Sequence, residues 1–485
     1  MPIIVIHQNM LIKKIITSAM MMAGGVIALQ AAPLDEARQL VKEGDFWEAR
    51  KLLEQAVASN PKLTSNAEYN YLLGACEYDS EHYDNARKLL ETARSKGYGF
   101  ANLYLGRLSF LDYDFDRATE LYNDFRKYRE KLGQVAGEDV EEAERELAIA
   151  ESAITRVEKI AVIDSLSVPQ DSFFEYYKLP NSSGKLVSPD AIPFEENRAG
   201  AVMAYSNEKG DYLMWGEPDS IGNVHLVETM RLLDGTWQTP KAVADHFSNR
   251  YADYPFMMPD GVTLYFASDG EGTMGGYDIF VATRDATTGE YLQPQNIGMP
   301  FNSPYNDYML AIDEENGIGW WATDRNRQGD NVTVYVYVVN DLRKNYDADD
   351  ENINKMARLS DYKSTWNDAD KGVYEEKLAA ISNMGNPQET QRKDFTFPIG
   401  NGEYYHSMTD FKNRAAFDAM NVYLKASNEL EKQEAKLDKL RRRYPVNRAD
   451  NLREEIIALE NNVDLKRKEL TKLKSNVYRC LKGEQ

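Results

Sequence analysis

The sequence contains few of the side chains that carry most recognisable chemistry. It has only two cysteines, Cys76 and Cys480, in 485 residues. Each falls at an apolar position of a helical pattern, so we expect two buried thiols and no disulfide framework. The five histidines form neither H-E-x-x-H nor another spacing that would bind a metal ion. These shortages argue against a disulfide-stabilised scaffold and against a zinc site.

Motifs of other catalytic classes are also missing from the sequence. It has no G-x-S-x-G turn, no Walker loop and no cysteine with a plausible histidine partner. We therefore predict that the protein is not an enzyme and that it uses no cofactor.

Positive charge is scarce as well. The chain has 57 Lys and Arg residues against 78 Asp and Glu residues, which gives a net charge of -21. Such a surface repels a nucleic-acid backbone and disfavours a tight grip on an anionic membrane. Aromatic residues make up 11% of the chain and include 30 tyrosines, so part of the chain should be β-sheet.

The first thirty residues differ from the rest of the chain. Lys13 and Lys14 precede an apolar run from Ile15 to Leu29, and small residues follow at Ala31 and Ala32. This is the order of a secretory signal peptide, so we expect residues 1–31 to direct export, with an uncleaved anchor as the alternative. Either Met1 or Met10 can be the true start. No cysteine lies near the cleavage site, so we expect no lipid anchor.

A helical period dominates residues 35–160, and one spacing recurs within it. An aromatic residue at Phe46, Tyr83 or Phe115 is followed three residues later by alanine, and apolar residues continue the helical period beyond it. A Leu-Gly pair precedes the last two copies. We assign the points where two helices cross closely to four small residues, namely Gly74, Ala86, Gly106 and Ala118.

This pattern resembles the tetratricopeptide repeat, a unit of two antiparallel helices. The resemblance implies an α-solenoid whose groove holds an extended peptide or a partner helix. A generic array of helical hairpins is the alternative. We expect the acidic helix from Asp139 to Glu158 to cap the array.

Beyond residue 160, short apolar runs bounded by Gly, Asp, Asn and Pro replace the helical period. The stretch 253–269 aligns with 307–324, and 201–215 is a weaker copy. These copies begin about 50 residues apart, which is the size of a four-stranded propeller blade. We predict an all-β propeller over residues 161–345.

One loop in this region, Gly270 to Gly275, has the G-x-G-x-x-G spacing of a dinucleotide site. That site requires a helix directly after the glycines. A strand-like run, Tyr277 to Val281, follows instead, so we interpret the loop as a connection between strands. A calcium site is a second alternative, although the EF-hand pattern is missing. We assign roles in turns and strand packing to Asp260, Gly261, Asp269, Gly275, Gly276, Tyr277 and Asp278.

The stretch Pro259 to Asp285, PDGVTLYFASDGEGTMGGYDIFVATRD, resembles the TolB-type, WD-like β-propeller repeat. Tetratricopeptide repeats joined to such a propeller are similar to cell-envelope proteins of Bacteroidota, including OmpA-linked proteins associated with type IX secretion. The resemblance implies a periplasmic location. No recognisable OmpA-like domain follows, so peptidoglycan anchoring does not carry over. Three blade units are visible, and residues 160–168 and 394–405 are candidates for further strands.

The remainder of the chain divides into a connector and a helical segment. Residues 346–412 form a mixed connector that can complete the propeller. Over residues 413–482, apolar residues recur in steps of three and four in two runs separated by Pro445. We predict an antiparallel coiled-coil hairpin, which can act as a spacer, dock onto a partner or form a dimer.

The sequence therefore predicts a multidomain α and β protein with an N-terminal α-solenoid, a central all-β propeller and a C-terminal coiled-coil hairpin. We expect a non-enzymatic periplasmic scaffold or adaptor for outer-membrane or cell-envelope assembly or secretion. Its protein partners would bind the repeat groove, the propeller face and the coiled coil. The sequence is also compatible with peripheral association with an outer-membrane complex. One alternative is a propeller that binds glycan or peptidoglycan fragments, and another is a propeller hydrolase or lyase.

Overall fold

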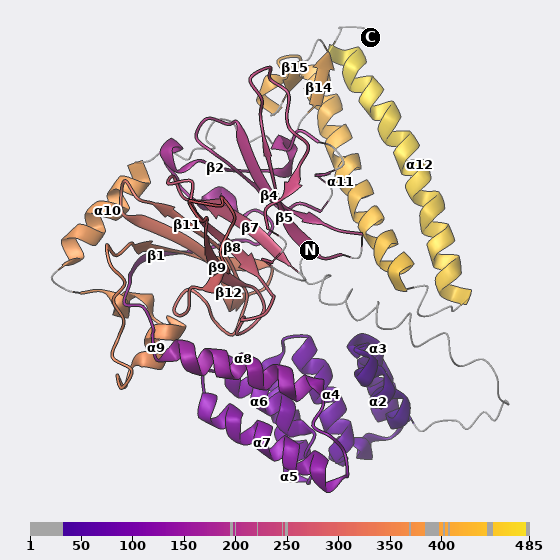
Figure 1. The fold of residues 1–485 in the computed structure, drawn as a ribbon. Coiled ribbons are helices and arrows are strands. Elements are labelled where there is room, and N and C mark those ends of the chain that lie inside the picture. Colours follow the sequence, from indigo (N-terminus) through magenta and orange to yellow (C-terminus); the bar gives the residue numbers. More distant parts are fainter. Residues whose placement is uncertain are drawn as a thin grey trace. The chain divides into compact units, whose positions relative to one another are not determined.

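The computed structural model describes residues 33–194, 197–198, 200–220, 222–244, 246–247, 251–367, 370–383, 397–400, 403–405, 408–443 and 450–481. The predicted signal peptide therefore lies outside the described residues. The chain divides into two compact units, Met1–Met384 and Gly385–Gln485, and most of their helices and strands are labelled in Figure 1.

The first unit begins with a run of paired helices. These are α2 (Pro33–Glu43), α3 (Phe46–Ser59), α4 (Ala67–Asp79), α5 (Tyr83–Ser95), α6 (Ala101–Leu111), α7 (Phe115–Lys131) and α8 (Glu138–Ile154). The side chains of Asp45, Asn66 and Asp114 cap α3, α4 and α7 by accepting a backbone N–H from the first turn. Each even-numbered helix from α2 to α6 packs against the helix that follows it.

The predicted small residues lie where paired helices approach most closely. A Cβ at Gly74 would come within 2.8 Å of Leu90 Cγ on α5, and a Cβ at Gly106 would overlap the Tyr122 ring on α7. Ala86 and Ala118, on the partner helices, are fully buried. Larger side chains at these positions would push the helices of a pair apart.

Antiparallel sheets follow the helices in chain order. The first contains β2 (Lys185–Val187), β3 (Ala204–Ser206), β4 (Tyr212–Pro218), β5 (Val224–Met230) and β6 (Lys241–Ala242). The second contains β7 (Ala252–Met257), β8 (Thr263–Ser268), β9 (Asp278–Thr283) and β10 (Gln295–Asn296). The third contains β11 (Asp307–Asp313), β12 (Ile318–Gln328), β13 (Asn331–Val338) and, at its edge, β1 (Ala161–Pro169). Within each sheet, strands that are neighbours in sequence pair with one another, except for β1.

The strand β1 comes first in the β region but completes its last sheet. It pairs antiparallel with β13, so that Val162 lies opposite Tyr337 and Val168 opposite Val332. The segment 160–168, expected from the sequence as a source of a further strand, thus supplies the outer strand of the third sheet.

The connector covers the outer edge of β1. The Trp366 indole N–H donates to Val162 O at 2.6 Å, and the Val162 N–H donates to Thr365 Oγ1 at 3.0 Å. The connector also contains the helices α9 (Ile353–Arg358) and α10 (Lys371–Asn383). Side chains of the connector therefore bond to the backbone N–H and carbonyl at the edge of β1. The sequence had left open that the connector completes the propeller with strands.

The sequence expectation for residues 394–405 needs correction. In the described part of this segment, β14 (Phe397–Gly400) pairs with β15 (Glu403–Tyr405) in a two-stranded sheet of its own. Both strands belong to the second unit, and the Phe397 ring packs against Phe411, Tyr423 and Tyr478 of that unit. This aromatic contact explains why the hairpin does not extend a sheet of the first unit.

Corresponding positions of the sheets carry large buried rings. Trp215 lies on β4, Phe266 on β8 and Trp321 on β12, and all are at most 1% exposed. Each of these strands pairs on both sides within its sheet. The strand β7 contacts β3 and β4 of the first sheet and β11 of the third. The sheets therefore pack side by side on one continuous core.

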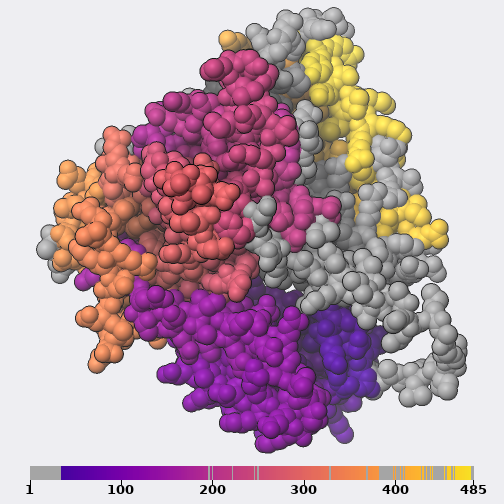
Figure 2. All heavy atoms as spheres, viewed as in Figure 1, coloured from indigo at the N-terminus to yellow at the C-terminus, as the bar shows by residue number. Residues whose placement is uncertain are grey.

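The helical part and the β region share a hydrophobic cluster, which we call the junction cluster. Residues 103–157 supply Leu103, Phe110, Tyr113, Phe115, Ala118, Tyr122, Phe125, Val140, Ala143, Leu147, Ala150, Ala153 and Val157. Met274 and Met299 from the β region and Ala357 from α9 complete the cluster. Hydrogen bonds add to this contact, from Tyr305 Oη to Leu111 O at 3.2 Å and from the Glu158 N–H to Met299 O at 2.9 Å. In Figure 2 the helical part and the β region meet along a continuous boundary.

The second unit is built on two long helices, α11 (Arg414–Arg443) and α12 (Asp450–Leu481), which pack against each other. Their shared cluster contains Leu430, Leu437, Leu440, Ile456 and Val463. Lys466 Nζ lies 3.7 Å from Glu429 Oε1 across the pair. Cys480, expected to be buried, is partly exposed, whereas Cys76 in α4 is fully buried; both thiols are free. Among the described helices, none combines the length and apolar character of a membrane span.

Replacing Gly106 with alanine should loosen the α6–α7 pair. The added Cβ collides with the Tyr122 ring, so we expect G106A to lower the free energy of unfolding by about 1–3 kcal/mol in urea denaturation. The control is G372A, because a Cβ at Gly372 meets nothing within 4 Å and alanine favours the helix. Equal stability of G106A and the wild type would show that the two helices do not need this close approach.

Candidate functional site

The glycine-rich loop between β8 and β9 connects the β region to the helices. Its Met274 is fully buried and belongs to the junction cluster together with Phe110 and Phe115. The strand β9 begins at Asp278, directly after the loop. The loop therefore places an apolar anchor between two regions, and it lacks the following helix whose N-terminus would hold a pyrophosphate.

The two glycines at the end of this loop lie against a second loop. A Cβ at Gly275 would come within 2.6 Å of the Pro304 carbonyl carbon, and a Cβ at Gly276 would overlap the Asn306 side chain. Asn306 Oδ1 accepts the N–H of Tyr277 at 3.0 Å. These glycines thus allow the chain to pass close to residues 303–306.

The Asp278 side chain fixes the glycine-rich loop through hydrogen bonds. Its Oδ2 accepts the Met274 N–H at 2.9 Å and the Asn296 amide at 2.6 Å. Burial, and after it the neighbouring carboxyl of Asp307, raise the pKa of Asp278 well above its usual range. A protonated carboxyl at this position avoids the cost of a buried charge.

The remaining predicted positions lie farther from the junction. Asp260 accepts the N–H groups of Val262 and Thr263 at 2.8 and 2.9 Å and so caps the β7–β8 turn, where Gly261 has a φ of 66°. Asp269 follows β8 and is partly buried. Tyr277 belongs to a group of rings with Tyr254 and Tyr308, whose centroids are 6.1 and 6.0 Å from its own.

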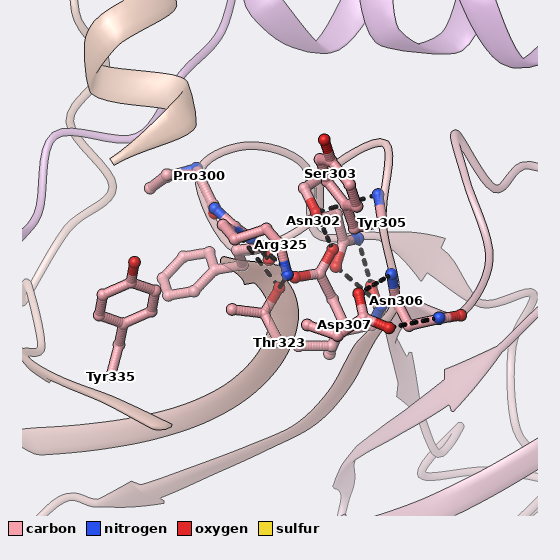
Figure 3. Close-up of polar contacts among 12 residues, drawn as sticks. Pro300, Asn302, Ser303, Tyr305, Asn306, Asp307, Thr323, Arg325 and Tyr335 are labelled. Carbon is pink, nitrogen blue, oxygen red and sulfur yellow. Dashed lines mark hydrogen bonds and ion pairs between the residues drawn. The ribbon is translucent and has the colours of Figure 1, made fainter. Parts of the chain in front are cut away.

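A buried ion pair lies beside the junction (Figure 3). Arg325 Nη2 is 2.7 Å from Asp307 Oδ1, and the two side chains are 2% and 0% exposed. Arg325 also donates to Pro300 O at 2.8 Å and to Phe301 O at 2.7 Å, and Ser303 Oγ donates to Asp307 Oδ2 at 2.7 Å. The pair joins β11 and β12 to the loop that carries Met299.

Two further carboxyls lie along the inner strands. Asp324 accepts the Asn306 amide at 2.6 Å and the Tyr308 hydroxyl at 3.0 Å, yet burial raises its pKa to about 6. Burial raises the pKa of Asp253 to about 7, and the N–H groups of Tyr254 and Gly216 oppose this rise. Asp253, Asp278 and Asp307 are at most 5% exposed. Their geometry suits them to hold strands and loops together.

No metal centre emerges in the parts of the chain that the structure describes. Among those residues, no group of three or more His, Cys, Asp or Glu side chains is arranged to hold an ion.

The helical part presents a partly exposed group of side chains, which we call the tyrosine face. It consists of Tyr71 and Tyr78 on α4, Tyr104 and Arg107 on α6, and Glu146 on α8. The Tyr104 ring lies 6.1 Å from the Tyr71 ring and 5.3 Å from the Tyr78 ring. The Arg107 guanidinium donates to Asp139 O at 3.3 Å, and the neighbouring Tyr78, Tyr104 and Glu146 raise its pKa through their charges. The face therefore spans α4, α6 and α8, three helices that contact one another in succession.

Glu146 is electrostatically unusual for a helix surface. Burial raises its pKa to about 7, Arg107 lowers it, and Glu142 one turn away raises it again. Partly exposed tyrosines around a charged group are typical of protein-binding surfaces, because each ring offers apolar area and a hydroxyl that can form hydrogen bonds.

A second surface feature is a cleft of about 620 Å³ between α8 and the β region. Its residues are Ala148, Ile149, Ser152, Ala153 and Arg156 from the α8 side, and Gln295, Asn296, Ile297, Gly298, Arg343 and Asn345 from the β side. It borders β10, the edge strand of the second sheet.

The sequence predicts the residues of turns and helix crossings, but it does not predict the Arg325–Asp307 pair or the tyrosine face. The helical period placed Tyr71, Tyr78 and Tyr104 on helices without distinguishing them from core residues. The seven-residue step from Tyr71 to Tyr78 is the one signal that they share a helix face. Nothing in the spacing indicates that Arg325 pairs with Asp307.

Comparison with known proteins identifies one part of the chain. A family model described as tetratricopeptide repeat matches residues 40–105, which run from α2 into α6. The tetratricopeptide prediction is confirmed for these residues. No curated protein and no solved structure matches the chain.

Replacing Arg325 with methionine should destabilise the first unit strongly. R325M leaves the Asp307 carboxyl buried without its cation and removes donors from Pro300 O and Phe301 O, so we expect a loss of about 3–5 kcal/mol in urea denaturation. The matched control is R117M, whose partner Glu120 is exposed and which should cost at most about 1 kcal/mol. Similar losses in the two variants would contradict a special role for the buried pair.

The buried carboxyl of Asp253 should make stability depend on pH. Because its folded pKa is about 7, the folded state keeps a proton that the unfolded chain releases near pH 4, and stability falls as pH rises between these values. The D253N variant keeps an oxygen acceptor and cannot ionise. We expect it to match the wild type near pH 4 and to exceed its free energy of unfolding by up to about 4 kcal/mol at pH 8. Asp324 and Glu146 titrate in both proteins, so parallel pH profiles would refute this assignment.

Proposed function

We propose that this protein is a non-enzymatic periplasmic scaffold or adaptor whose helical repeats bind a protein partner. The observation that carries the proposal is the tyrosine face on the tetratricopeptide-repeat part of the chain. Tetratricopeptide repeats generally mediate contacts between proteins, and stacked helical pairs form extended binding surfaces. The proposed role in cell-envelope assembly or secretion derives from the sequence resemblance.

The physical case for the tyrosine face lies in its combination of exposure and rigidity. Its tyrosines are partly exposed and pack against the helical core, and the helices beneath them are fixed by buried residues such as Leu72 and Leu105. A rigid aromatic side chain loses little conformational entropy when a partner covers it. A partner would therefore gain contact area without having to order the surface first.

We propose further that the β region is a propeller-type domain. Support comes from the succession of antiparallel sheets, the equivalent buried rings Trp215, Phe266 and Trp321, and the pairing of β1 with β13. In a propeller, joining the first strand to the last sheet ties the ends of the domain together.

The second unit is proposed to be an antiparallel coiled coil. Its buried residues Leu430, Leu437, Ile456 and Val463 occur at the predicted steps of the apolar pattern. Such a hairpin can serve as a spacer or as a dimerisation element. The periplasmic location rests on the signal-like residues 1–31.

Removing rings from the tyrosine face should abolish partner capture. In intact native cells, we expect chemical crosslinking followed by mass spectrometry to recover the same partner protein with the wild type and with W47A. Trp47 is the matched control because it is 55% exposed on α3 and lies outside the tyrosine face. The Y78A/Y104A variant should lose most of that crosslink, by about tenfold or more, since each ring at the centre of an interface contributes about 1–2 kcal/mol.

Two controls make this experiment decisive. Circular dichroism melting curves must show that Y78A/Y104A remains folded, and the single variants Y78A and Y104A replace it if it does not. Unchanged crosslinking in a folded variant would place the partner site elsewhere, and the absence of any partner would refute the adaptor proposal.

A further inference from the structure

The cleft between α8 and the β region differs in charge from the rest of the chain. Its lining includes two arginines, Arg156 and Arg343, and no Asp or Glu, although the chain as a whole carries a net charge of -21. The amides of Gln295 and Asn345 and the hydroxyl of Ser152 add further hydrogen-bond donors. The cleft is thus a local concentration of donors in an acidic protein.

Arg343 is held rigidly at one end of the cleft. It donates from Nη1 to Ile297 O at 3.0 Å and from Nη2 to Arg156 O at 3.2 Å, and its Nε lies 3.7 Å from Glu158 Oε2. A guanidinium has five N–H donors, so these contacts fix the group and leave donors to spare. A ligand that binds there does not have to order this side chain.

Arg156 is the more available cation. Its Nη2 donates to Ser152 Oγ at 3.0 Å, and the residue is exposed at the end of α8. Among the described residues, no carboxylate forms an ion pair with it. The other N–H groups of its guanidinium are therefore available to a ligand in the cleft.

The floor of the cleft is apolar. Ile149 and Ala153 of α8 face Ile297 of the β region, and Ala153 and Ile297 are at most 8% exposed. An occupant can thus combine charged contacts at the rim with burial of aliphatic stems on the floor.

The edge of β10 is protected against addition of another strand. It contains two residues, Pro294 precedes it, and Arg343 covers the Ile297 carbonyl. Short edges, proline and positive charge all oppose strand pairing. Recognition in the cleft must therefore come from side chains of the occupant rather than from its backbone.

We propose that this cleft binds an acidic segment of a partner protein, with Asp or Glu side chains contacting Arg156 and Arg343. The site is separate from the tyrosine face and would give the protein a second docking point. Charge complementarity favours a negatively charged occupant, because the charged residues of the lining are the two cations Arg156 and Arg343. The exposure of Arg156, Arg343, Ser152 and Asn345 favours a chain segment over a small ligand, which would need a more enclosed pocket.

The test uses the full chain without residues 1–31 and three fluorescein-labelled peptides. The probe is Gly-Glu-Glu-Gly-Glu-Glu-Gly, and its Gln and Lys counterparts are the controls. Fluorescence anisotropy at low salt should show that the Glu peptide binds at least about fivefold more tightly than the Gln peptide, despite the overall negative charge. Binding should weaken as salt is raised.

Variants assign the binding to the cleft. R156Q should weaken Glu-peptide binding by about fivefold or more, whereas R117Q, which makes the same charge change at an exposed arginine of α7, should change it less than about twofold. S152E places a carboxylate at an exposed position of the cleft and should abolish binding; because serine at this position is exposed, the helix should fold normally. Y78A/Y104A should bind the Glu peptide as the wild type does, which separates this site from the tyrosine face.

Several results would overturn the proposal. Equal binding of the Glu and Gln peptides, or equal weakening by R156Q and R117Q, would show that the cleft does not select acidic chains. Displacement of the peptide by free glutarate at the peptide's own concentration would indicate a small-molecule site instead. A lysine peptide whose binding falls with R156Q would contradict the assigned sign of charge.

Discussion

The arrangement of the first unit depends on the buried pair between Arg325 and Asp307. A guanidinium with almost no contact to water is tolerated only if its donors are satisfied, and here a carboxylate and the carbonyl oxygens of Pro300 and Phe301 accept from it. These acceptors lie on β11 and on the loop before it. The same loop presents Met299 to the junction cluster. One side chain of β12 thus fixes the segment through which the sheets contact the helices.

This constraint makes the helices and the sheets of the first unit parts of one packed structure. Met274 and Met299 reach into a cluster formed largely by α6, α7 and α8, so separating the regions would expose both methionines. Methionine suits such a place because its flexible thioether fills the irregular space between elements of different geometry. A partner held by the tyrosine face and another held by the cleft beside α8 would therefore be kept at a defined separation.

The sequence predicted elements better than it predicted their connections. Helices follow from the 3.6-residue period, and strands such as β8 and β9 follow from short apolar runs between Gly and Asp, because both signals are local. Gly106 was predicted as a close approach of two helices, but the Tyr122 ring that it approaches could not be identified from the spacing. The Arg325–Asp307 pair, the tyrosine face and the cleft all require knowing which distant segments meet. For the same reason residues 394–405 were only a candidate source of propeller strands, since the aromatic partners of Phe397 lie on α11 and α12.

The position of β1 has a consequence for the order in which the molecule can form. Val162 leaves the ribosome long before Tyr337, the residue opposite it, so the third sheet cannot close until nearly the whole β region has been synthesised. Contacts between such distant segments slow folding, because the intervening chain must be brought together first. Until β13 arrives, β1 has an unpaired edge on both sides. For the exported location proposed above, this late closure would leave the β region without its third sheet while most of the chain is still being made.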